Sequence, residues 1–187
     1  PILCTDMSDS LRKTFLETYR SIRKHLPSAR TLLTTYFSSL GDNLSTALAS
    51  ECSGLHLDLC AGNLPIADVL TALPEHMSLS LGVVDGHNIW KTNCASVLPA
   101  LRNAALKRGH DKLLVGSSCS LLHVPVDLDL ETALDPEIKS WMAFAAQKCR
   151  EIALLGQTID GEWEPECLNE NRLAIESRHL NMKTFDP

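Results

Sequence analysis

One short loop segment holds residue types that bind metals or act as nucleophiles. The segment SSCSLLHVPVDLDLE, residues 117–131, follows the apolar run KLLVG. Cys119 and His123 have the spacing C-x-x-x-H, which could place two soft ligands near one metal ion. A tetrahedral zinc ion needs more ligands than these two, and none is adjacent. We therefore predict no metal in this chain and keep Cys119, His123 and Asp58 as the alternative ligand set.

Nucleophilic catalysis has equally little support in this segment. Cys119 and His123 could form a nucleophile and base, but no third group is visible to orient the histidine. Ser117, Ser118 and Ser120 lack the G-x-S-x-G elbow. The sequence also lacks G-x-G-x-x-G and G-x-x-x-x-G-K, which argues against a dinucleotide or P-loop site. We predict no catalytic residue.

Two other short stretches offer polar side chains that could bind a ligand. In LHLDLC, strand alternation puts His56, Asp58 and Cys60 on one face, either as ligands or with Asp58 capping neighbouring backbone and Cys60 packed as a small apolar residue. In VVDGHNIW, Asp85 and Asn88 could hold a polar ligand against a tryptophan, or form only a tight turn. Both alternatives stay open. The candidate ligand-adjacent residues are Asp58, Asp85, Asn88, Ser117, Cys119 and His123.

These residues follow short apolar runs that alternate with helical patterns. Apolar residues spaced by three and four predict helices at 9–26, 41–51, 64–73, 94–109 and 135–156. Apolar and β-branched runs predict strands at 30–37, 54–60, 78–84 and 111–118. Apolar strands separated by helices predict an α/β fold with a parallel sheet. The carboxyl ends of the strands, with His87 among them, would then share one rim.

Composition limits the partners and the compartment. The 187 residues suffice for one domain, with 44% hydrophobic and 21% charged residues. A net charge of −6 without a basic stripe argues against nucleic acid, and no apolar stretch is long enough to cross a bilayer. Seven cysteines without a CxxC pair favour reduced thiols, so we expect a cytoplasmic protein that uses neither nucleic acid nor membrane.

Four longer segments carry a resemblance to a known family. LLTTYF, GLHLDL, LSLGVVDGHNIWKTN and SSCSLLHVPVDLDLETALDPEIKSWMAFAAQKCREIALL resemble, in order and spacing, the N-terminal domain of cobalamin-independent methionine synthase. The resemblance implies the second half of a (β/α)₈ barrel of the TIM type over residues 1–156. Residues 157–187 are expected to form a polar extension with one short helix.

The resemblance also implies where the chemistry of the family lies. That family transfers a methyl group from 5-methyltetrahydrofolate polyglutamate to homocysteine, with zinc in a C-terminal domain that this sequence lacks. The positions that match the zinc ligands of that domain are residues 34–37, Asp58 and Cys119. Only a shortened carboxylate and one thiol remain there, so the resemblance implies no cofactor in this chain. The family's Asp-Glu-Pro after PIL is also altered, since only Asp6 is kept.

These observations favour a non-catalytic structural or partner-binding role. A half-barrel leaves strand edges and an inner face, expected to be apolar, open to water, which predicts self-association or association with a complementary barrel fragment. One alternative is a methyltransferase subunit that is active only with a separate catalytic domain. Another is a small ligand- or metal-binding protein that uses Cys119, His123, Asp58 and Asp85.

Overall fold

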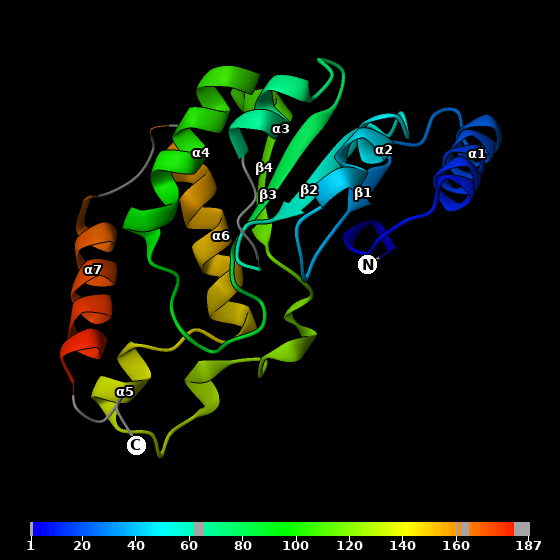
Figure 1. Cartoon of the computed structure of the whole chain (residues 1–187). Coiled ribbons are helices and arrows are strands. Elements are labelled where there is room, and N and C mark those ends of the chain that lie inside the picture. The colour runs from blue at the N-terminus through cyan, green and yellow to red at the C-terminus, as the bar shows by residue number, and fades with distance from the viewer. Residues whose placement is uncertain (1, 62–65, 160, 162–164, 182–187) are drawn as a thin grey trace.

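Four parallel strands form the sheet at the centre of the molecule (Figure 1). The computed structural model describes residues 2–61, 66–159, 161 and 165–181. The strands pair in chain order, so β1 and β4 are the edges of the sheet in this part of the chain. This arrangement confirms the α/β class and a half-barrel-like sheet. The strands are β1 (Leu32–Thr34), β2 (Gly54–Asp58), β3 (Ser78–Val84) and β4 (Leu113–Ser117).

Helices connect successive strands, as parallel pairing requires. The first helix begins where predicted, and its N-cap is Ser8, whose hydroxyl accepts a hydrogen bond from the Leu11 N–H. Residues 64 and 65 of one predicted helix lie outside the described residues. The helices are α1 (Asp9–His25), α2 (Leu44–Leu48), α3 (Ile66–Ala72), α4 (Cys94–Arg108), α5 (Pro136–Ser140), α6 (Ala145–Ile159) and α7 (Pro165–Leu180).

The predicted helix over 135–156 is wrong in its middle. Instead, α5 ends at Ser140 and α6 begins at Ala145. Between them, the Ala143 N–H donates to the Ile89 carbonyl, and the Trp141 carbonyl accepts from the Lys91 N–H. The segment thus pairs with the loop after β3 and cannot keep helical hydrogen bonds. Trp141 and Ala143 are buried by this pairing.

One face of the sheet carries the hydrophobic core. Alternate residues such as Leu55, Leu57, Leu79 and Leu81 are almost fully buried and join one cluster with side chains from α2, α3, α4 and α6. Burial of side chains of this size contributes about 2 kcal/mol each. This face therefore fixes the sheet against the helices and sets the register of the strands.

The opposite face is mostly polar or small, which corrects the expectation of an apolar inner face. His56, Ser80, Gly82 and Gly116 lie there, and a Cβ added to Gly82 would come within 3.0 Å of His56 Nε2. Sequence reasoning treated the strands as mostly apolar, noted a polar face only in LHLDLC, and overlooked the serines and glycines at alternate positions of β3 and β4.

The C-terminal helix α7 is tied to the start of α4. The Asn171 side chain accepts from the Cys94 N–H and donates to the Thr92 carbonyl. The division at residue 157 stays a prediction, and the end of the extension, 182–187, lies outside the described residues. No helix in the described part of the chain is long and apolar enough to span a membrane.

Candidate functional site

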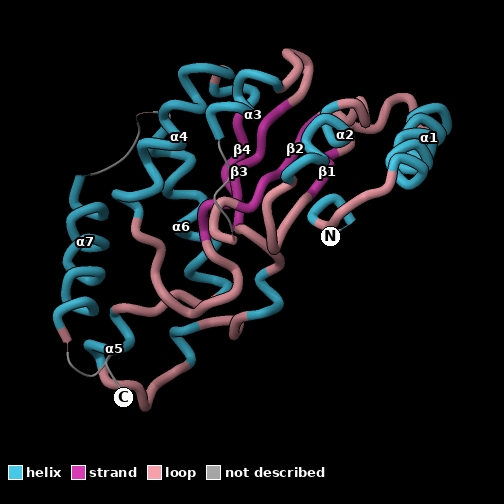
Figure 2. Tube along the Cα trace, in the orientation of Figure 1, coloured by secondary structure: helices cyan, strands magenta, loops and turns pink. Residues whose placement is uncertain are grey.

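The loops that follow β1, β3 and β4 meet at one end of the sheet, where Figure 2 shows loops gathered. The ring centroids of Phe37 and His87 lie 4.6 Å apart, and those of His87 and His123 lie 5.2 Å apart. Cys119 completes this group, because its Sγ and one ring nitrogen of each histidine all lie within 4.8 Å of one another. The predicted rim thus brings three strand ends together.

The Asp58 carboxylate accepts hydrogen bonds from backbone N–H groups of this rim. One carboxylate oxygen accepts from the Phe37 N–H at 2.9 Å, and the other accepts from the N–H groups of Cys60 and Ala61. Phe37 has φ of 75°, a left-handed conformation that costs on the order of 1 kcal/mol for a residue with a side chain. Asp58 thus supports that conformation. Both Asp58 oxygens already accept these hydrogen bonds, so Asp58 is not free to bind zinc. The positions that match the family's zinc ligands therefore do not fit a zinc ion.

The loop after β3 is organised by Asp85 and Asn88. The Asp85 carboxylate accepts from the His87 N–H and from the Asn88 amide, and the Asn88 oxygen accepts from the Trp90 N–H. These contacts are those of a tight turn. They also set where His87 stands on the rim.

Cys119 is buried under this turn. A Cβ on Gly86 would lie 2.8 Å from Cys119 Sγ, so only glycine leaves room for the sulfur. Ser118 Oγ accepts from the Gly86 N–H, and Ser117 ends β4 opposite Val84. Burial raises the pKa of the Cys119 thiol.

His56 lies below the rim, on the polar face of the sheet. Its Nδ1 is 2.8 Å from Ser80 Oγ, and its side chain is 6% exposed. Burial lowers the pKa of His56. The neutral ring is thus favoured, and it fills the space left by Gly82 and Gly116.

Sequence reasoning missed two charged side chains of α6 behind the rim, of which one is buried and the other partly buried. Lys148 is fully buried, and its Nζ donates to the Trp90 carbonyl at 3.0 Å. Glu151 accepts from the Thr92 N–H and hydroxyl. Burial lowers the pKa of Lys148 and raises that of Glu151, and each charge partly offsets the effect on the other. The two side chains hold the loop after β3 against α6.

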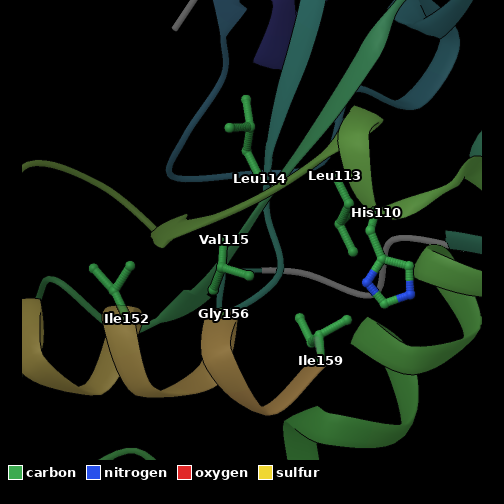
Figure 3. A pocket seen from close by; sticks show the side chains of 7 residues that line it. All are labelled: His110, Leu113, Leu114, Val115, Ile152, Gly156 and Ile159. Carbon is green, nitrogen blue, oxygen red and sulfur yellow. The ribbon is translucent and has the colours of Figure 1, made fainter. Parts of the chain in front are cut away.

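A groove runs beside the edge strand β4 (Figure 3). Leu113 and Val115 point toward α6, where Ile152 and Ile159 face them, while Leu114 points away. The groove has a volume of about 180 Å³ and is lined by His110, Leu113, Leu114, Val115, Ile152, Gly156 and Ile159.

Among the predicted site residues, only Cys119 and His123 come together as possible ligands. Asp58, Asp85 and Asn88 are near but bind backbone or one another. The sequence placed His87 on the rim but did not identify it as a ligand. The segment DGHN contains this histidine, but the sequence alone does not show that it lies near Cys119. The pairing of β3 with β4 brings the two side chains together.

One family model matches this chain. The family model for "Cobalamin-independent synthase, N-terminal domain" matches residues 1–108. These residues include β1, β2, β3 and α4 but not the loop that holds Cys119 and His123.

Individual relatives extend the similarity over nearly the whole chain. A protein of Rhodopseudomonas palustris strain CGA009 is 45% identical over 188 residues, which cover 100% of this chain and 24% of the relative. A protein of Syntrophotalea carbinolica is 42% identical over 178 residues, which cover 95% of this chain and 24% of the relative. Both are named 5-methyltetrahydropteroyltriglutamate–homocysteine methyltransferase. The chain thus spans about a quarter of the length of these relatives.

Proposed function

Because this chain belongs to the family of the cobalamin-independent synthase N-terminal domain, we propose that it is a structural, partner-binding unit of a methyltransferase and is not catalytic alone. The reaction is the one that the relatives' names state, between 5-methyltetrahydropteroyltriglutamate and homocysteine. In this proposal the zinc of the family reaction lies in another domain. We place the unit in the cytoplasm, which its seven free thiols fit.

The main support for this proposal is the edge of the sheet at β4. In the described residues β4 pairs only with β3, and the groove beside it, which is lined mostly by apolar residues, lies between the strand and α6. An unpaired strand edge offers backbone hydrogen bonds, and an apolar groove offers burial for side chains of a further strand or helix. The partner that fits both is the complementary (β/α) part of an N-terminal barrel of this family.

A complementation experiment tests this function. The Rhodopseudomonas palustris relative is expressed without the quarter that this chain matches, and the chain is added in trans. We expect the two to co-purify and methionine formation to rise above that of either alone. Absence of co-purification would contradict the proposal, whereas co-purification without a rise would remove only the methyltransferase-subunit alternative.

A pair of substitutions on α6 provides the control. A Cβ on Gly156 meets nothing within 4 Å, so Gly156→Arg is expected to leave the fold intact while its side chain fills the groove. Gln157→Arg adds the same charge at an exposed neighbour. Only Gly156→Arg should abolish co-purification. Equal binding by both variants would show that the groove is not the interface.

A further inference from the structure

The group formed by His87, Cys119 and His123 combines one thiol with two imidazoles. Their ligand atoms lie within 4.8 Å of one another and come from the loops after β3 and β4. In the residues that the structure covers, this is the one group of three or more such side chains that could hold a metal ion. The ligands therefore converge through the fold and not through a local sequence motif.

The two imidazoles are available for binding, whereas the Cys119 thiol donates to the Ser120 carbonyl at 3.7 Å and would give up this contact as a thiolate. No hydrogen bond within the described residues engages the ring nitrogens of His87 or His123, and both rings are exposed. Phe37 packs against both rings, at centroid distances of 4.6 and 5.8 Å, and limits the directions in which they turn. Cys119 Sγ is held against Gly86. The site thus has one fixed ligand and two that can close onto an ion.

The neighbouring carboxylates do not add to this set. Asp58 accepts three backbone hydrogen bonds, and Asp85 accepts one from the His87 N–H and one from Asn88. Ligation by either would break contacts that shape the loops carrying His87 and Phe37. Three protein ligands remain, which is the pattern of a zinc site with an open coordination position.

We propose that His87, Cys119 and His123 bind one Zn²⁺ ion, with water in the fourth position. One thiolate and two imidazoles suit zinc, whereas Mg²⁺ and Ca²⁺ prefer oxygen ligands. Ligand atoms around a tetrahedral zinc ion lie about 3.3–3.6 Å apart, so the exposed histidines must move inward by about 1 Å. This site is separate from the zinc of the family reaction and does not depend on the proposed function.

Metal titration of the full chain tests the proposal. After treatment with a chelator and a reductant, zinc is titrated against a chelating dye, and cobalt is used as a spectroscopic probe. We expect one zinc ion per chain and a thiolate-to-cobalt charge-transfer band. Cys119→Ser should abolish the band, and both Cys119→Ser and His87→Gln should weaken zinc binding by more than about tenfold.

Matched controls separate this site from the other thiols and imidazoles. Cys149→Ser and His25→Gln change exposed residues of α6 and α1 and should leave affinity and spectrum unchanged. His87 is exposed, so His87→Gln decides the question if Cys119→Ser does not fold. The proposal is overturned if the chain binds no stoichiometric zinc, or if His87→Gln binds zinc as tightly as the unchanged chain.

Discussion

Several residues of the rim form structural contacts that cannot be predicted from residue type alone. Asp58 and Asp85 look like ligands in the sequence, but their oxygens accept backbone hydrogen bonds. Cys119 and His123 were recognised from their spacing. His87 was not linked to them, because its approach to Cys119 depends on how β3 and β4 pair. Burial of Lys148 equally depends on packing between distant segments.

The acceptor role of Asp58 predicts a stability loss in Asp58→Asn. Asparagine keeps one acceptor oxygen and turns an amide toward backbone N–H groups, which leaves buried donors unsatisfied. We expect a loss of about 1–3 kcal/mol in the free energy of unfolding. Urea denaturation of the full chain measures it.

Asp129→Asn is the matched control for that change. Asp129 is exposed and forms a surface ion pair with Arg150 at 3.5 Å, and such pairs contribute little. If both asparagine variants unfold at the same urea concentration, the hydrogen bonds of Asp58 do not stabilise the rim.

At the scale of elements, the sequence was accurate wherever local pattern decides the structure. Strands β2 and β3 and helices α1 and α4 follow from the spacing of apolar residues. The break between α5 and α6 could not be predicted in this way. It depends on pairing between residues 89–91 and 141–143, which are far apart in the chain. The polar face of the sheet, in contrast, could have been predicted from the serines and the glycine that alternate with leucines in β3.

Two glycine substitutions should have opposite effects on these elements. In β3, a Cβ on Gly82 would lie 2.8 Å from the Ser117 carbonyl oxygen, so Gly82→Ala should destabilise the chain by about 1–3 kcal/mol. In α6, Gly156→Ala meets open space and should stabilise the helix by up to about 1 kcal/mol.

Thermal unfolding of the two alanine variants, followed by circular dichroism, measures both effects. A melting temperature that rises in Gly82→Ala would mean that β3 and β4 approach less closely than described. A fall in Gly156→Ala would mean that the helix does not continue through this position.

At the scale of the whole molecule, the sheet has two edges, and partly exposed leucines lie on them. Leu32 on β1 is 46% exposed and Leu114 on β4 is 49% exposed. Unprotected strand edges promote pairing between chains. The sequence suggested association from the half-barrel resemblance, and the structure directs attention to these edges.

Light scattering over a range of concentrations tests association of the chain alone. We expect the native mass to rise from 20.5 kDa toward twice that value as concentration increases. Leu114→Lys should shift this rise to higher concentration, because a charged side chain on an edge opposes pairing. Leu106→Lys, at an 86% exposed position on α4, is the control. A constant monomer mass at every concentration would contradict the prediction.

The order of the strands has a consequence for how the chain is made. Each strand pairs with the one that precedes it in the sequence, so β2 finds β1, β3 finds β2 and β4 finds β3. During synthesis from the N-terminus, every new strand can therefore dock on a template that has already left the ribosome. Contacts that close over short stretches of chain also favour rapid folding. The sheet can thus grow one strand at a time during translation, and at each step its open edges are that of β1 and that of the most recently added strand.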